Sequence, residues 1–143
     1  MDANQHNVIW EHRQAELWDR IFQVTQDVVM LADVMESTAG GAIMRTEMVK
    51  SAMDVGKYLV RATAADNGND FDTNVSEARL KAIETDYWLR LAYIIQQRED
   101  VQRDVSSVIT QYSGIIDLLQ KMSRHVQEKH DFARHNRGPK ISL

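Results

Sequence analysis

The apolar residues near the N-terminus recur at helical spacing and predict a long first helix over residues 8–36. One stripe repeats at alternating steps of four and three residues, which places its members on one side of a helix: Leu17, Ile21, Val24, Val28, Leu31 and Met35. A second stripe lies about 100° further round the same helix: Trp18, Phe22, Val29 and Ala32. One partner helix cannot cover both stripes, so we expect this helix to bury a wide face.

Three further stripes follow, each bounded by turn-forming residues. Residues 37–41, with paired glycines, end the first helix, and residues 65–70, with Asn-Gly at their centre, end the second. The second helix carries Met44, Met48, Ser51, Ala52, Val55, Leu59 and Ala62. The third is expected to bury Leu80, Ile83, Tyr87, Leu91 and Ile94, flanked by Trp88 and Ile95. The fourth is the most regular: Val101, Val105, Val108, Tyr112, Ile115, Leu119, Met122 and Val126. No run alternates as a strand would, so the pattern predicts an all-α fold.

The boundary between the third and fourth stripes is open. Residues 96–100 contain no Gly or Pro, and the apolar phase passes through them almost unbroken. Asp100 is a candidate N-cap for a fourth helix, and one continuous rod is the alternative. A compact core favours a turn, because three long apolar faces need a fourth to close them into a four-helix bundle.

Length and composition narrow the class of protein. At 143 residues the chain has the size of one domain, which we expect to span residues 1–130. The absence of cysteine excludes disulfide frameworks and zinc-thiolate sites. Residues 1–5 do not read as the start of a signal peptide. The longest apolar run, residues 28–32, is far too short for a membrane span. A cytoplasmic location is therefore expected.

Charge is unevenly distributed along the chain. Residues 121–140 hold six basic and two acidic residues, a net charge of +4, so the remainder carries −8 of the total of −4. Such asymmetry can mark a nucleic-acid-binding segment, with these candidate contacts: Lys121, Arg124, Lys129, Arg134, Arg137 and Lys140. The alternative is that the first of these charges complement the dipole of the last helix, and that residues 131–143 form a disordered basic tail.

No set of residues in the sequence assembles into a catalytic or metal-binding motif. The Glu-x-x-His pattern of di-iron bundles does not occur. His125, His130 and His135 are five residues apart, which turns each about 140° from the last, so one helix face cannot present all three. Glu84 lies beside an apolar cluster and has no obvious second carboxylate or base as a catalytic partner, so we interpret it as a structural carboxylate bonded to a neighbouring helix. We expect no cofactor, no metal and no small-molecule substrate.

Two short segments and four single positions carry a family resemblance. Residues 84–91, Glu-Thr-Asp-Tyr-Trp-Leu-Arg-Leu, match the pattern E-T-x-Y-W-L-x-L, and residues 50–56, Lys-Ser-Ala-Met-Asp-Val-Gly, match a basic-Ser-small-x-x-aliphatic-Gly segment. Between them stand Asp70, Phe71, Ala78 and Ala82. The chain thereby resembles the bacterial four-helix-bundle proteins named for the intervening sequences of 23S ribosomal RNA genes. The Avd accessory proteins of diversity-generating retroelements belong to the same superfamily. The resemblance spans residues 15–126 and is most specific over residues 48–91.

The resemblance implies an antiparallel up-down four-helix bundle, a break at residues 96–100 and a ring-shaped homopentamer. Its retroelement members use basic surfaces to engage nucleic acid and a reverse transcriptase. This chain departs from the family pattern at Tyr58 and Arg61, where Asn and Glu are usual, and at Asn74, where a basic residue is common. Its body is also acidic, so a strong nucleic-acid role does not transfer.

These observations lead to three hypotheses for the function of the protein. The first is a non-catalytic homo-oligomeric scaffold or interaction protein, with Trp18, Phe22 and Val29 of the second stripe in the interface. The second is an RNA- or DNA-associated accessory protein that binds weakly through the basic C-terminal segment. The third, an enzyme or metal carrier, has no acid–base pair or ligand set to support it.

Overall fold

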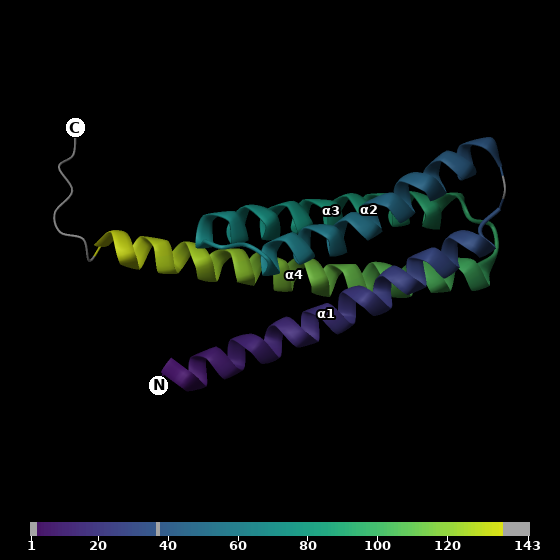
Figure 1. The fold of residues 1–143 in the computed structure, drawn as a ribbon. Helices are drawn as coiled ribbons and strands as arrows, with labels where there is room; N and C mark the ends of the chain where they lie inside the picture. Colours follow the sequence, from purple (N-terminus) through teal and green to yellow (C-terminus); the bar gives the residue numbers. More distant parts are fainter. Residues whose placement is uncertain (1–2, 37, 136–143) are drawn as a thin grey trace.

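The computed structural model describes residues 3–36 and 38–135, and the side chains of residues 15–36 and 38–123. This part of the chain forms α1 (Ala3–Val34), α2 (Ala39–Thr63), α3 (Gly68–Ile95) and α4 (Glu99–His135), and contains no strand. The helices run alternately up and down, so α1 begins and α4 ends at the same end of the bundle (Figure 1). The predicted all-α four-helix bundle is confirmed.

The helix boundaries follow from local hydrogen bonds. The Thr38 hydroxyl accepts from the Gly41 amide at 3.0 Å and caps α2, while the Asn67 side chain accepts from the Asp70 amide at 2.8 Å and caps α3. A Cβ on Gly41 would lie 2.7 Å from the Thr38 hydroxyl oxygen, so this capped turn requires glycine. Side-chain capping of this kind satisfies amides that have no partner within the helix.

The break between α3 and α4 is confirmed, but Asp100 does not cap α4. The helix begins at Glu99, so Asp100 lies in its first turn. There its carboxylate accepts from Arg98 at 2.6 Å, and this hydrogen bond lowers the pKa of Asp100. The Gln102 side chain donates to the carbonyls of Tyr93 and Gln96, at 3.1 and 2.8 Å, and so holds the break.

At its other end α4 is longer than expected. It continues to His135, so residues 131–135, which were expected to be disordered, are helical. Residues 136–143 of the expected tail lie outside the described part of the chain.

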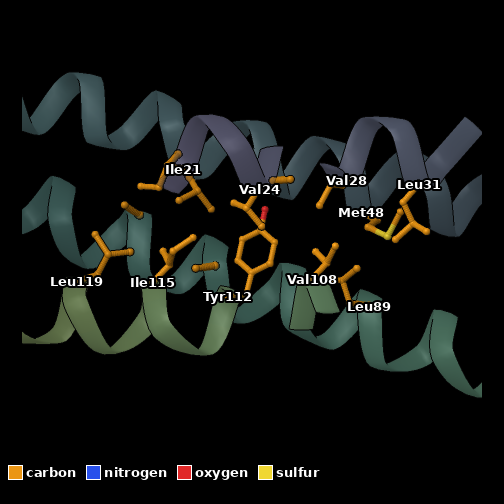
Figure 2. Packing of buried hydrophobic residues seen from close by; sticks show 14 of the residues in the cluster. Ile21, Val24, Val28, Leu31, Met48, Leu89, Val108, Tyr112, Ile115 and Leu119 are labelled. Atoms are coloured by element: carbon orange, nitrogen blue, oxygen red, sulfur yellow. The ribbon is translucent and has the colours of Figure 1, made fainter. Parts of the chain in front are cut away.

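The core lies along the bundle axis, with α1 and α3 each packed against both α2 and α4. Figure 2 shows part of it, with Tyr112 reaching from α4 across the core towards Val24 of α1. The first stripe of α1 is buried as predicted, and so is every described member of the α4 stripe, from Val101 to Met122. Val126 lies outside the described side chains.

The predicted stripe of α3 is wrong. Leu80, Ile83, Tyr87 and Ile94 are exposed, and Leu91 is half-buried. The buried face of α3 instead holds these residues: Val75, Ala78, Ala82, Thr85, Leu89 and Ala92. Four of these six side chains are small, so the larger residues on the outside give the more conspicuous apolar pattern.

Polar groups lie at two places in the interior. The hydroxyls of Ser51 on α2 and Thr85 on α3 lie 2.9 Å apart and are both buried. The Ser51 hydroxyl is also close to the carbonyl of Met48, and the Thr85 hydroxyl is close to the carbonyl of Lys81. Tyr112 is fully buried, and no described residue hydrogen-bonds its hydroxyl.

Candidate interaction surfaces

Large apolar side chains are exposed on three of the four helices. Among the described side chains, twelve have at least 39% of their surface exposed: Phe22, Met30, Val34, Ile43, Met53, Val60, Leu80, Ile83, Tyr87, Tyr93, Ile94 and Ile95. None of them lies on the described part of α4. Single exposed apolar residues are ordinary, whereas aligned ones mark interaction sites.

The first alignment runs along the outside of α3. Leu80, Ile83, Tyr87 and Ile94, which we call the α3 outer face, are spaced by three, four and seven residues and therefore share one side of the helix. At 100° per residue this side points almost directly away from the buried one. Tyr87 and Ile94 are 61% and 76% exposed, so no described residue covers the centre of this face.

Small residues on the inner side explain this arrangement. Ala78, Ala82 and Ala92 present only methyl groups to the core, which lets the α2 and α3 backbones approach closely. At the height of Thr85 the two helices meet through its hydroxyl pair with Ser51. Ile83 and Tyr87, which are larger, stand on the opposite side of α3 and are exposed.

The second alignment lies across α1 and α2. Trp18 stacks on Phe22 with ring centroids 5.7 Å apart, and Phe22 is 69% exposed. On α2, Met53 and Val60 are seven residues apart and both more than half exposed. With Val29 of α1, these residues form what we call the α1–α2 face: Trp18, Phe22, Val29, Met53 and Val60.

Contacts between the helices place these five residues on one side. Ile21 of α1 faces α2, because a Cβ on Gly56 would lie 3.8 Å from its Cγ2. Asp27 turns the other way, where it accepts from Gln111 of α4 at 3.3 Å. Trp18 and Phe22 lie beyond Ile21 around the circumference of α1, on the side away from α4.

On α2, Ser51 faces α3, whereas Arg45 faces the end of α1, where it donates to the carbonyl of Met35, the residue after that helix, at 3.1 Å. Met53 and Val60 lie beyond Arg45 around the circumference of α2, on the side away from α3. The five residues of the α1–α2 face therefore lie on the same outer side of these two helices.

Charged residues flank both faces. Lys50 and Lys57 lie beside Met53 on the outer side of α2, and Lys57 pairs with Asp54 of the same helix at 3.5 Å. Lys57 and Arg61 also lie over the Tyr58 ring, at 5.1 and 5.2 Å. Asp19 and Asp33 are exposed on the opposite border, on α1.

On α3 the two borders of the outer face differ in sign. Glu77 and Glu84 stand on the border towards α2, and Arg90 stands on the border towards α4. Arg90 pairs with Asp86 at 2.8 Å, within the helix.

The residues predicted from sequence are distributed as follows. Phe22 is exposed, and Trp18 and Val29 are partly so, on one side of α1. Glu84 accepts from Lys81 at 3.2 Å, and this bond raises the pKa of Lys81. Among described side chains Glu84 bonds within its own helix, so the expected bond to a neighbouring helix is not formed.

Of the candidate nucleic-acid contacts, Lys121 is exposed on α4. The side chains of Arg124, Lys129 and Arg134 are not described, although their backbone belongs to α4, and Arg137 and Lys140 lie outside the described residues. No group of three His, Asp or Glu side chains in the described part is placed to hold a metal ion. No helix in that part of the chain is long and apolar enough to cross a membrane.

Sequence reasoning missed the α3 outer face and the contribution of α2. The signal for α3 was present as small residues at core spacing, Ala78, Ala82, Thr85 and Ala92, opposite the larger ones. The contribution of Met53 and Val60 required knowing which side of α2 borders α1.

Comparison with known proteins identifies a fold. No family model matches the chain, and no curated protein matches it. A solved structure does: a protein of unknown function from the S23 ribosomal protein family of Bacteroides thetaiotaomicron, with a TM-score of 0.71 and 20% sequence identity. The match covers 78% of this chain and 98% of that one. At this identity the likeness shows that the two proteins share a four-helix-bundle fold.

Proposed function

We propose that this protein is a non-catalytic helical bundle that assembles with copies of itself into a ring of five chains and serves as a scaffold or interaction protein. The observation that carries the proposal is the presence of two separate faces with aligned, exposed apolar side chains, on α3 and across α1–α2. Apolar surface of this kind gains free energy when a partner removes it from water.

The family assignment belongs to the same proposal. The motifs at residues 50–56 and 84–91 contain Ser51 and Thr85, and these two residues meet in the core at 2.9 Å. The motif residues thus include a specific contact that sets the spacing of α2 and α3. Together with the fold shared with an S23 family protein, this supports membership of the 23S rRNA intervening-sequence family, and the five-chain ring follows from that resemblance.

Light scattering on the full chain tests the assembly. We expect a single species at micromolar concentration with five times the 16.5 kDa chain mass. Phe22→Asp should shift this species towards smaller ones, because an unpaired charge would be buried if Phe22 lies in the interface. Ser106→Asp, at an exposed α4 position, is the matched control. A monodisperse wild-type monomer would end the proposal.

A weaker second proposal concerns nucleic acid. The net charge of +4 over residues 121–140 supports local contact with phosphate, while the −8 of the remaining chain opposes it. We propose that any such binding is weak, non-specific and an accessory to assembly.

A further inference from the structure

We propose that assembly is head-to-tail: the α3 outer face of one copy packs on the α1–α2 face of the next. The proposal rests on the self-assembly proposed above, and it adds which surfaces meet and which residues fix their register. The observation behind it is that the charged borders of the two faces are opposite in sign and lie within two residues of the same height along the bundle.

The two faces lie on different sides of the molecule. Met53 lies on the side of α2 that is turned away from α3. Ile83 lies on the side of α3 nearer α4, the side from which Asp72 accepts a hydrogen bond from Ser123 of α4 at 2.8 Å. A two-fold contact of either face with itself would leave the other face exposed. A contact between unlike faces covers both and generates a ring when the rotation closes.

The borders match in sign. The α1–α2 face has lysines along its α2 border and aspartates along its α1 border. The α3 outer face has glutamates along one border and Arg90 along the other. Two copies can lie side by side with parallel axes, related only by a rotation about an axis parallel to the helices. The glutamate border of one copy then lies next to the lysine border of its neighbour. The same rotation brings Arg90 to the aspartate border.

The borders also match in height. Ser51 and Thr85 stand at the same height, because their hydroxyls are 2.9 Å apart. The two helices run in opposite directions, so Lys57, six residues after Ser51, stands level with residue 79 of α3. Glu77 is two residues from that level, about 3 Å along the axis. Copies related by rotation about an axis parallel to the helices keep their heights, so Lys57 of one copy meets Glu77 of the next.

The same arithmetic gives two further pairs. Lys50 stands level with residue 86, two residues from Glu84. On the other border, Ile21 stands level with Gly56, and through it with residue 80 of α3. Asp33 then stands level with residue 92, two residues from Arg90. Long lysine and arginine side chains span such offsets, and opposite charges in register fix orientation.

Apolar residues occupy the centre at matching heights. Met53 stands level with Ile83, and Phe22 stands within one residue of the level of Leu80. An apolar centre with a charged border is the usual anatomy of a protein interface.

Site-directed cross-linking tests the pairing directly, because the chain has no cysteine of its own. With both Met53→Cys and Ile83→Cys, a short bis-maleimide should produce a ladder of covalent multimers. Each single variant should remain monomeric on a denaturing gel. Met53 and Ile83 face different sides of one chain, so a link within the chain does not compete.

The outcomes separate the two proposals. Covalent dimers from a single variant would show a two-fold interface and overturn the head-to-tail arrangement. An assembled double variant that yields no multimers would also overturn it. A wild-type chain that is monomeric by light scattering would instead end the self-assembly proposal itself.

Charge exchange between chains tests the register. One chain carries Lys50→Glu and Lys57→Glu, and a second carries Glu77→Lys and Glu84→Lys. Each alone places like charges along the border, so we expect the concentration at half-assembly to rise at least about tenfold. Mixed in equal amounts, the two chains should assemble again, because each restores the partner of the other.

A control separates register from net charge. Arg103→Glu with Lys121→Glu on α4 changes the net charge by the same amount as the first variant, at exposed positions outside both faces. This control should assemble like the wild type. A mixture that stays dissociated, or charge-reversed chains that assemble alone as the control does, would overturn the proposed register.

Discussion

Helices α3 and α4 pack side by side, and both carry many large apolar residues, yet they place them oppositely. On α4 the heptad-like stripe turns inward, from Val101 to Met122, and the described outer surface is polar. On α3 the inner side is mostly small and the outer side holds Leu80, Ile83, Tyr87 and Ile94. An apolar stripe of the same period therefore means core in one helix and exposed surface in the other.

The difference shows what each helix contributes. α4 supplies bulk to the core, and Tyr112, Ile115 and Leu119 are among its largest fully buried side chains. α3 instead packs closely against α2, because its buried residues are small, and the hydroxyls of Ser51 and Thr85 meet between the two helices. A helix that buries mainly methyl groups on one side is free to present an apolar surface on the other.

The largest expected effect comes from truncating one residue of each kind. Leu119→Ala on α4 should cost about 2–5 kcal/mol of unfolding free energy, because it leaves a cavity in a fully buried site. Ile83→Ala on α3 should change it by less than about 0.5 kcal/mol. Urea unfolding at a concentration low enough to favour monomers provides the measurement. Equal losses would contradict the view that the two stripes differ in kind.

A second prediction reverses the size pattern of α3. Ala82→Leu adds volume between α2 and α3, where Ala82 has no exposed surface, and should cost about 1–3 kcal/mol through overpacking. Ala39→Leu, at an exposed position on α2, serves as the control for adding a leucine and should be nearly neutral. Thermal melts of both variants decide the matter. An unchanged Ala82→Leu variant would mean that α3 does not depend on close approach.

These two helices also show how far the sequence predicts the structure. The stripes of α1 and α4 were readable because their core residues are the largest apolar residues in each repeat. On α3 the core residues are mostly alanine and threonine, and periodicity weighted by size selects the wrong side. The helix break at residues 96–98 has no Gly or Pro and depends on Gln102 hydrogen bonds to carbonyls of Tyr93 and Gln96, which propensity does not reveal.

The candidate surface was only partly predictable. The second stripe of α1 indicated a face with Trp18 and Phe22, because it exceeded what one partner helix covers. The lysine border and Met53 depend on how α2 is rotated against α1, a property of packing at Gly56 and Ile21. Likewise, the match in height between Lys57 and Glu77 depends on the Ser51–Thr85 contact, which joins residues 34 positions apart.

A third prediction concerns the polar atom inside the α4 stripe. Burial raises the pKa of Tyr112, with a smaller contribution from the negative charge of Asp27. The folded state thus holds the neutral phenol, while the unfolded chain ionises near pH 10. Stability should be constant with respect to this group below pH 10 and fall as the pH rises above it.

Tyr112→Phe tests both parts of that reasoning. It removes a buried hydroxyl that no described residue hydrogen-bonds, so stability at pH 7 should stay the same or rise by about 1 kcal/mol. It should also lose less stability than the wild type between pH 9 and 11, as measured by urea unfolding at each pH. A loss of more than about 1 kcal/mol at pH 7 would show that the hydroxyl is satisfied.

The smallest expected effect is on nucleic-acid binding by the C-terminal end of α4, which follows the buried stripe that ends at Met122. Residues 121–140 offer six basic groups, and the rest of the chain carries −8. With at most six phosphates neutralised, binding to single-stranded RNA should weaken about 300-fold between 50 and 200 mM salt. Neighbouring chains in an assembly would raise the local concentration of these groups without changing that dependence in kind. Fluorescence anisotropy with the full chain, and with a chain ending at Lys129, should therefore show weak binding that truncation lowers only modestly.

The control chain with Arg103→Glu and Lys121→Glu should behave much as the truncated one does, because both lose positive charge. Tight binding that resists 200 mM salt and disappears on truncation would show that the basic segment is a recognition element, and that α4 as well as α3 presents a functional surface.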